Sequence, residues 1–412
     1  MAQKVTVFNF GTCAKCFDAT LLLPADNGYE LKRALEPSKW VPSPIDVAVI
    51  TGYLLPKDKV LVEKIAKNAK LVIAFGSCAA TGGPFGLACA RGTKVTPARD
   101  MVEAIDVHGC VGEWFELHQV IKGNQPDRAK LCDACKRRST CKFLSEVVRQ
   151  IDPSQDDESC FNDRGFMCNG YVARQCKEKC IDVATPCRAC KPLVDHPGIR
   201  MLSMFGTLMA NVEVGTEATG GIAGTDKLAD APDDVTRSVP DVSGAFFRFS
   251  LPVEMPIGKL PSTGSILSDV FTGRPLEELP LLAGMLGGRR AISMVLDIIE
   301  AYENGTGIEI NDIVKGYRNK LREIEAQMQS VTKAGDAAWY GSAADAIRKI
   351  AGNMNLSNIF FGGFKTPIKD EQAPFDEYKS KIIEFKKGTY QAGRVKYAID
   401  AEGKVNEFSW RP

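Results

Sequence analysis

The first two cysteines of the chain stand two residues apart in the segment TCAKCF, directly after an apolar stretch that predicts a strand. Two thiols at this spacing can form a redox-active dithiol, half of a zinc site or half of an iron–sulfur site. The pair formed by Cys13 and Cys16 does not distinguish these chemistries. The decision depends on the number and arrangement of the other cysteines.

Cysteine usage separates the two halves of the chain. All 14 cysteines lie between Cys13 and Cys190, and none follows in the rest of the 412 residues. We find no export signal, so a disulfide framework is not expected and metal binding is favoured. With three histidines, at positions 108, 118 and 196, the chain is poorly supplied for histidine-rich metal sites. We expect no catalytic residue of its own, so bond-making chemistry should lie on a partner.

The first 125 residues alternate apolar runs with amphipathic stretches. Strands are predicted at 4–10, 46–51, 71–75 and 105–108, and helices near Phe17, around 60–65 and at 113–120. This alternation indicates an α/β domain built on a doubly wound parallel sheet. Sites in such sheets form beyond the carboxyl ends of the strands.

Four cysteines follow predicted strands at that edge. Cys13 and Cys16 follow the first strand, Cys78 follows the third in GSCAATGG, and Cys110 follows the fourth in HGC. Neighbouring glycines permit tight turns and leave amide N–H groups free to bond sulfur. Cys78 or Cys110 alone could be a small core residue, but four thiolates at one edge favour a cubane cluster, with zinc as the alternative. Cys89 lies outside this set and is predicted to be a packed thiol.

Nine more cysteines lie between residues 132 and 190. Their regular spacings are CxxC at 132–135, Cx7C at 160–168, Cx3C at 176–180 and CxxC at 187–190. Two CxxC pairs are typical of a zinc ribbon, which would leave the other five cysteines unused. Two cubane clusters would use eight of the nine, so iron–sulfur is favoured and zinc at one site stays open. Cys141, in a basic run, is the expected spare, and Cys160 is the residue that it would replace as a ligand.

The ordered series TCAKC, GSCAATGG, HGC, CDAC, SCFNDRGFMCNGYVARQCKEKC and TPCRAC resembles the small subunit of cytoplasmic NiFe hydrogenases. The resemblance is to the group that includes the methyl-viologen-reducing and deazaflavin-reducing enzymes, and the first part is also similar to the proximal-cluster subunit of complex I. It implies a flavodoxin-like sheet followed by a cysteine-rich iron–sulfur segment and an α+β C-terminal extension. It further implies an electron-transfer subunit of a multi-subunit oxidoreductase, most readily a NiFe hydrogenase.

The resemblance also implies three 4Fe–4S clusters and their ligands. The proximal cluster would face the large subunit, the medial cluster would follow, and the distal cluster would lie next to the exit partner. The implied ligands are Cys13, Cys16, Cys78 and Cys110 (proximal), Cys176, Cys180, Cys187 and Cys190 (medial), and Cys132, Cys135, Cys160 and Cys168 (distal).

The implied partners are a hydrogenase-like large subunit and a further iron–sulfur or flavin electron-transfer subunit. One alternative stays open within this class: a hydrogenase-like electron wire in a non-hydrogenase complex linked to a flavin or a low-potential acceptor. A second alternative, from another class, is a zinc-stapled scaffold without a redox role.

Three departures from the hydrogenase pattern fall near the first cysteine set. Thr51 stands where relatives usually carry a glutamate, Val111 and Gly112 replace prolines, and Lys15 places a cation inside the first CxxC. We expect Lys15 and Thr51 to be buried by another chain. A cation at position 15 could also raise the reduction potential of a nearby cluster.

The remaining predictions concern organisation. We expect a flavodoxin-like domain at 1–125, a cysteine-rich domain with two clusters at 126–211, a loop or linker at 212–242 and an α+β extension at 243–412 that docks other subunits. Within the extension we predict helices at 289–303 and 310–332, the second with a solvated charged face that includes Arg318 and Glu325, and a β-hairpin at 394–410.

Charge and hydropathy exclude two classes of partner. The formal net charge is +1 and the isoelectric point is near 7.4, so the composition does not indicate nucleic-acid binding. No apolar stretch is long enough to span a bilayer, so no direct membrane span is expected. We predict a cytoplasmic protein.

Overall fold

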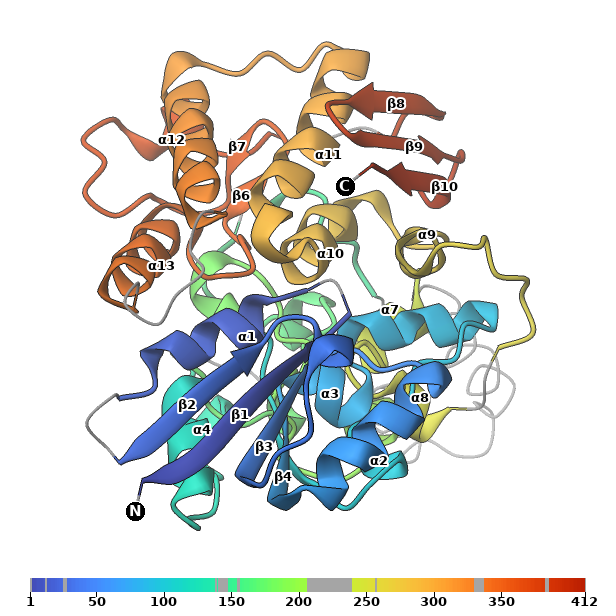
Figure 1. Ribbon diagram of the computed structural model, residues 1–412. Helices are drawn as coiled ribbons and strands as arrows, with labels where there is room; N and C mark the ends of the chain where they lie inside the picture. Colours follow the sequence, from blue (N-terminus) through green and yellow to red (C-terminus); the bar gives the residue numbers. More distant parts are fainter. Residues whose placement is uncertain are drawn as a thin grey trace, which may run out of the picture.

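A five-stranded parallel sheet forms the N-terminal part of the molecule (Figure 1). Its order is β2-β1-β3-β4-β5, which is the flavodoxin-like order, so the predicted fold class is confirmed. The edge strand β2 was not predicted, because its residues YELKRA alternate charged with apolar side chains and are only partly buried. The strands are β1 (Gln3–Phe10), β2 (Tyr29–Ala34), β3 (Ile45–Gly52), β4 (Ala69–Phe75) and β5 (Ile105–Val107).

The computed structural model describes residues 2–11, 13–24, 28–137, 139, 147–153, 156–205, 239–255, 258–329, 337–381 and 385–411. Cys141 and most of the predicted linker lie outside these described residues.

Helices cover both faces of the sheet. One face packs on α1 (Lys15–Ala19) and α4 (Trp114–Ile121), and the other packs on α2 (Lys59–Lys67) and α3 (Ser77–Thr81). The central strands β1, β3 and β4 are therefore buried on both faces, which explains their continuous apolar runs. Each strand ends in a loop at the edge that faces the C-terminal half of the chain (Figure 1).

Between residues 132 and 190 the described part of the cysteine-rich segment contains short 3-10 turns, and a helical stretch follows at residues 197–205. These turns are η6 (Cys132–Ala134), η8 (Asn162–Arg164), η9 (Asn169–Val172) and η10 (Cys180–Val183). Short turns of this kind leave backbone N–H groups available for other acceptors.

The C-terminal half is α+β, as predicted. It contains α7 (Val242–Phe246), α8 (Leu251–Glu254), α9 (Ile266–Phe271), α10 (Leu279–Leu286), α11 (Ala291–Thr306), α12 (Asp312–Met328), α13 (Ala337–Ala351), α14 (Phe375–Tyr378) and the strands β6 (Ile359–Phe360), β7 (Gly363–Phe364), β8 (Gly388–Ala392), β9 (Val395–Ile399) and β10 (Val405–Trp410). The predicted hairpin is the antiparallel pair β9–β10, and β8 adds a third strand to it.

Local signals explain one end of α11 and one end of α12. Helix α11 ends at Thr306 and is followed by Gly307, which takes the left-handed conformation that favours glycine after a helix. Helix α12 begins after Asn311, whose side chain accepts a hydrogen bond from the Val314 N–H.

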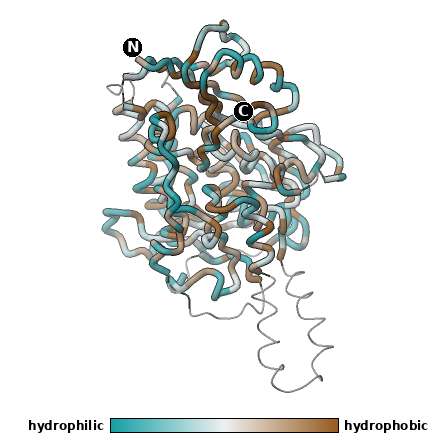
Figure 2. The backbone as a smooth tube through the Cα atoms, turned by 90° about the horizontal axis from the view of Figure 1, so that it is seen from below, coloured by the Kyte–Doolittle hydropathy of each residue, from teal (hydrophilic) through white to brown (hydrophobic). Residues whose placement is uncertain are grey.

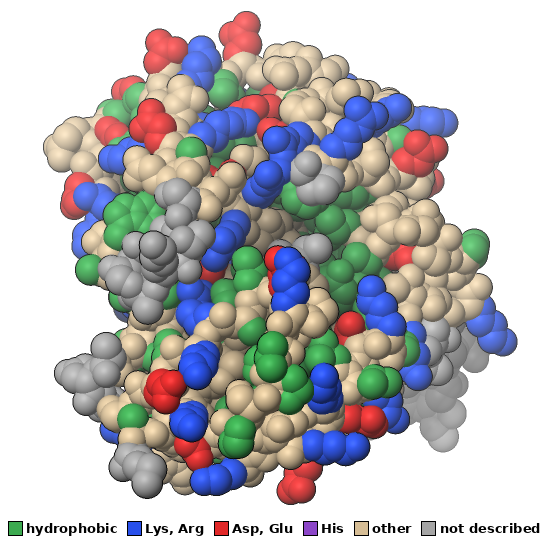
Figure 3. All heavy atoms as spheres, in the orientation of Figure 1, with side chains coloured by type: hydrophobic (Ala, Val, Ile, Leu, Met, Phe, Trp, Pro, Cys, Tyr) green, Lys and Arg blue, Asp and Glu red, His purple; other side chains and the backbone are tan. Residues whose placement is uncertain are grey.

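The two halves share one hydrophobic core. Helix α10 has the sequence LPLLAGML, is buried on all sides and packs against α11 and the 3-10 segment η4 (Gly83–Arg91) of the N-terminal half. A helix that is apolar all round is expected to lie inside a protein. Figure 2 shows hydrophobic stretches running through the interior, and Figure 3 shows acidic and basic side chains spread over the surface of one face.

The predicted solvated face of α12 is wrong at two positions. Arg318 is 2% exposed and donates to both carboxylate oxygens of Glu303 at 2.6 and 2.8 Å. Glu325 is also buried and accepts from the backbone N–H of Ile292 at 2.7 Å. These charges therefore join α12 to α11 instead of facing water.

Replacing Arg318 with methionine should destabilise the C-terminal half strongly, because it leaves the buried Glu303 carboxylate without its cation. The expected loss is about 3–5 kcal/mol of unfolding free energy, measured by urea denaturation. The matched control is Lys320→Met on the exposed side of the same helix, which should change the free energy by less than about 0.5 kcal/mol. Equal effects of the two variants would contradict a buried Arg318–Glu303 pair.

Candidate metal-binding sites

The first cysteine set gathers at the carboxyl ends of the strands. Cys13 lies between β1 and α1, Cys78 lies in α3 after β4, and Cys110 lies beyond β5. The Gly112 N–H donates to Cys16 Sγ at 3.3 Å. The structure thus brings the four predicted proximal residues to one edge.

Glycines line the cysteines of this set closely. A Cβ at Gly76, whose φ is +89°, would lie 2.5 Å from Cys16 Sγ. A Cβ at Gly83 would lie 2.8 Å from Cys78 Sγ. These positions form a cradle that admits no side chain larger than hydrogen beside the sulfurs.

Four bare thiolates are electrostatically unfavourable in this place. Burial raises the pKa of Cys110 well above its ordinary value, and the charges of Cys78, Cys190, Cys16 and Cys13 raise it further. Burial, with the charge of Cys13, raises the pKa of Cys16 to about 12. A positively charged metal centre would remove this penalty, because metal ligation requires and stabilises the thiolate. The donor set therefore fits a metal–sulfur group.

The cysteines predicted for the medial site also lie together. Burial raises the pKa of Cys180 to about 12, and the nearby charge of Cys190 adds to the shift. The pKa of Cys176 is raised by burial and then by the charges of Cys190 and Cys180. The Ala189 N–H turns back onto Cys187 Sγ at 3.3 Å. Backbone N–H donors to sulfur are typical of iron–sulfur sites.

The cysteines predicted for the distal site form the third group. Burial raises the pKa of Cys132 to about 12, followed by the charges of Cys168, Cys135 and Cys160. A Cβ at Gly170 would lie 3.4 Å from Cys132 Sγ and 3.6 Å from Cys168 Sγ, so the two sulfurs flank one point. Cys132 is exposed, whereas Cys13 and Cys110 are buried.

Direct contacts connect the three groups in series. Ser77, next to Cys78 of the first group, donates its hydroxyl to the Cys190 carbonyl oxygen at 2.5 Å, which joins the first group to the second. The Asn169 N–H, next to Cys168 of the third group, donates to the Cys187 carbonyl oxygen at 2.8 Å, which joins the second group to the third. The order from the enclosed edge to the surface is therefore first, second and third group.

Lys15 is enclosed by the C-terminal half of its own chain. Its side chain, in a residue 8% exposed, donates to the carbonyl oxygen of Met354 at 2.6 Å and to that of Gly284. Cys13 Sγ lies 3.6 Å from the carbonyl oxygen of Met285. Burial lowers the pKa of Lys15, and the charges of Cys13 and Cys110 oppose that shift.

The expectation that another chain buries Lys15 and Thr51 is therefore wrong, because both are buried within this chain. Thr51 belongs to β3, is fully buried, and its hydroxyl donates toward Phe8 O and Asn9 Oδ1, each at 3.2 Å. No local pattern indicates this burial, because the residues that cover Lys15 lie about 270 to 340 positions away along the chain.

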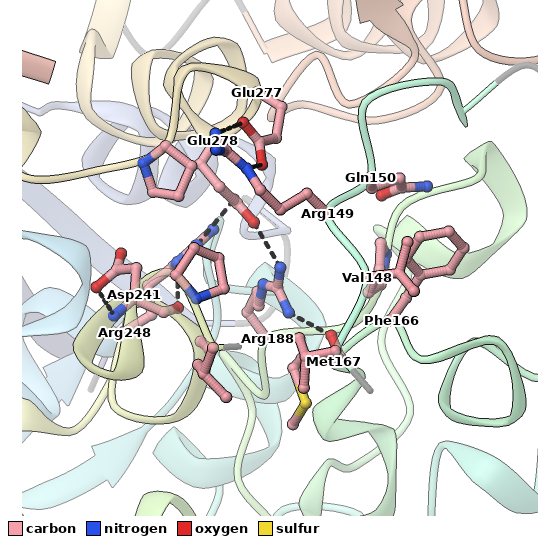
Figure 4. A pocket seen from close by; sticks show the side chains of 17 residues that line it. Val148, Arg149, Gln150, Phe166, Met167, Arg188, Asp241, Arg248, Glu277 and Glu278 are labelled. Atoms are coloured by element: carbon pink, nitrogen blue, oxygen red, sulfur yellow. Dashed lines mark hydrogen bonds and ion pairs between the residues drawn. The ribbon is translucent and has the colours of Figure 1, made fainter. Parts of the chain in front are cut away.

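A second buried cation lies inside the last CxxC pair. Arg188 donates to the Met167 carbonyl and, at 2.5 Å, to Glu278, which also accepts from Arg248 at 2.8 Å (Figure 4). Although burial opposes it, the two guanidinium groups hold the pKa of Glu278 well below its ordinary value. The Arg188 charge also faces Cys168 and Cys187. Sequence spacing identified the cysteines but not this Glu278 counter-ion from η12 (Leu276–Glu278).

The remaining thiols differ in what the structure describes. Cys89 is buried apart from the three groups, and its sulfur accepts from the Val95 N–H at 3.4 Å. Cys141 is not among the described residues, so the choice between Cys141 and Cys160 stays a prediction. In the described part of the chain, no group of three or more His, Cys, Asp or Glu side chains is arranged to hold a single metal ion. Nor is any helix there both long and apolar enough to cross a bilayer.

Comparison with known proteins places this arrangement in a wider context. Residues 21–122 match the family described as NADH ubiquinone oxidoreductase, 20 Kd subunit. A subunit of the F420-non-reducing hydrogenase vhu of Methanocaldococcus jannaschii is 24% identical over 61% of this chain and 96% of its own. The iron-sulfur subunit of an F420-non-reducing hydrogenase of Archaeoglobus profundus is 23% identical over 62% of this chain and 98% of its own.

A solved structure, titled NAD+-reducing [NiFe]-hydrogenase in the H2-reduced state, aligns with 31% of this chain and 95% of its own at 15% identity. Its TM-score of 0.27 is too low to indicate a shared overall fold.

The comparisons confirm the predicted resemblance to hydrogenase small subunits and the assignment as an oxidoreductase subunit. They also support iron–sulfur cofactors and a place in a multi-subunit complex. About two fifths of this chain lies outside each of these two hydrogenase matches.

Gly76→Ala should disrupt the first site, because its new Cβ would collide with the Cys16 sulfur. If each of the three cysteine groups holds the same amount of iron, the purified protein should lose about a third of its iron. Elemental analysis measures this loss. Gly123→Ala is the matched control: its φ is +83°, so it carries a similar backbone cost of about 1–2 kcal/mol, but no atom lies within 4 Å of the added Cβ. Equal iron in both variants would show that the cradle does not hold a metal group.

Proposed function

We propose that this chain is the iron–sulfur electron-transfer subunit of a hydrogenase-type complex, with three 4Fe–4S clusters that relay electrons between a large subunit and a redox partner. The ligands are the three groups of four cysteines named above, from the group of Cys13, which is buried, to the group of Cys132, which is exposed. The observation that carries the proposal is their connection in series, through the contact of Ser77 with Cys190 and that of Asn169 with Cys187. Electron transfer falls off steeply with distance, so adjoining sites suit a relay.

The surroundings of the sulfurs support iron–sulfur clusters as the resident groups. When bound, such clusters supply one-electron redox chemistry. The chain's residues supply backbone N–H donors to sulfur and place the cations Lys15 and Arg188 beside the ligands. Donors and cations of this kind stabilise the reduced form of a cluster and so raise its potential.

The partner assignment follows from exposure. Cys132 is exposed in the turn η6, which favours the third group as the point of electron exchange with an iron–sulfur or flavin subunit.

The surroundings of the first group favour a second candidate function, an electron wire in a non-hydrogenase complex. The chain itself covers the edge of the sheet where the sequence resemblance puts the large subunit. Dihydrogen uptake with dye reduction by the native complex would favour the hydrogenase, and a nickel-free complex without uptake would favour the wire.

Metal analysis of anaerobically purified protein tests the proposal directly. Three 4Fe–4S clusters predict about twelve irons and twelve acid-labile sulfides per chain and a brown protein. On reduction, electron paramagnetic resonance should show several magnetically coupled species, as expected for adjoining clusters. Colourless protein that contains zinc and no labile sulfide would reject the relay and support a zinc-stapled scaffold.

A further inference from the structure

A loop from the cysteine-free half reaches two of the three cysteine groups at once. This loop, Asn353–Ser357, follows α13 and is almost completely buried. Asn353 Nδ2 lies 3.7 Å from Cys180 Sγ, within hydrogen-bonding range for sulfur, and Asn355 Nδ2 donates to the Cys110 carbonyl oxygen at 2.6 Å. One short segment therefore contacts a predicted ligand of the first group and one of the second.

The orientation of the Asn353 amide is fixed by its other contacts. Its Oδ1 accepts from the backbone N–H groups of Asn355 at 3.0 Å and Ser357 at 3.1 Å. Because both of these partners can only donate, the oxygen must face them and the NH₂ group must face Cys180 and the Glu178 carbonyl, 3.3 Å away. The amide is thus held as a donor toward the sulfur.

The loop is fastened to both cysteine loops through its backbone as well. The Met354 N–H donates to Glu178 Oε2 at 2.7 Å, and the Met354 carbonyl accepts from Lys15 at 2.6 Å. Glu178 stands between Cys176 and Cys180, and Lys15 stands between Cys13 and Cys16. The two asparagines are therefore held in place by the same loops that carry the sulfurs.

We propose that Asn353 is a positioning residue that raises the reduction potential of the cluster of Cys180 by donating to the sulfur of that ligand. Asn355 holds the Cys110 loop through its carbonyl oxygen, and its own Oδ1 faces the Cys110 sulfur at 3.9 Å, so it supplies that sulfur with no donor. Donated hydrogen bonds stabilise the more negative, reduced state. The inference rests on the proposed iron–sulfur function and assigns the C-terminal half a part in setting its potentials.

The test is a redox titration of the full chain followed by electron paramagnetic resonance. The cluster of Cys180 is identified as the signal that changes in Cys180→Ser. In Asn353→Ser the shorter side chain still offers an acceptor oxygen but no longer reaches the sulfur. We expect the equilibrium constant for reduction of that cluster to fall about tenfold, which is 59 mV for one electron.

The matched control is Asn358→Ser. Asn358 is equally buried one residue beyond the loop, but its NH₂ group donates to the carbonyls of Ile350 and Thr366 and its Oδ1 accepts from Thr366. This variant should keep the wild-type potentials.

Three outcomes distinguish the possibilities. A lowered potential in Asn353→Ser that is confined to the cluster of Cys180 supports the inference. An unchanged potential in Asn353→Ser, or an equal shift in Asn358→Ser, overturns it while the clusters remain. Wild-type protein without iron–sulfur signals would instead reject the proposed function on which the inference rests.

Discussion

The burial of the Lys15 ammonium inside the first CxxC is the constraint on which the arrangement of the two halves depends. A buried cation is costly unless polar groups replace its water. Here the carbonyl oxygens of Gly284 and Met354 supply that replacement, and both belong to the C-terminal half. The first cysteine loop and the C-terminal half must therefore be in contact for Lys15 to be buried in this form.

The same principle recurs at the other end of the cysteine series. Arg188, inside the last CxxC, is compensated by Glu278, again from the C-terminal half (Figure 4). Glu178, beside Cys180, is compensated by Arg348 of α13 at 2.6 Å. Each of these charges lies within one or two residues of a predicted ligand. The cysteine-free half thus serves as the electrostatic and hydrogen-bonding environment of the cysteine-rich half.

Sequence reasoning succeeded where the signal was local. Strand-length apolar runs predicted β1, β3, β4 and β5, and turn chemistry predicted the β9–β10 hairpin. The positions of Cys13, Cys16, Cys78 and Cys110 after strands predicted a common edge, because parallel strands bring their carboxyl ends together. The resemblance then supplied a grouping for the cysteines between 132 and 190 that periodicity could not provide.

Reasoning from local sequence failed where the partner of a residue is distant along the chain. Arg318 and Glu325 look like solvated charges on an amphipathic helix, and only packing on α11 reveals their burial. Asn353 and Asn355 resemble ordinary loop residues, because nothing near them in the sequence contains a cysteine. The edge strand β2 was missed because an edge position relaxes the requirement for apolar residues.

Enclosure of the first cysteine group by its own chain is the feature from which the other conclusions follow. Hydrogen–deuterium exchange on the chain purified without partners measures this enclosure, through the peptides that contain residues 13–19 and 353–357. We predict slow exchange in both peptides, comparable with the central strand β3. Rapid exchange in both, becoming slow only when another subunit is added, would contradict the enclosure and show that a partner covers this edge.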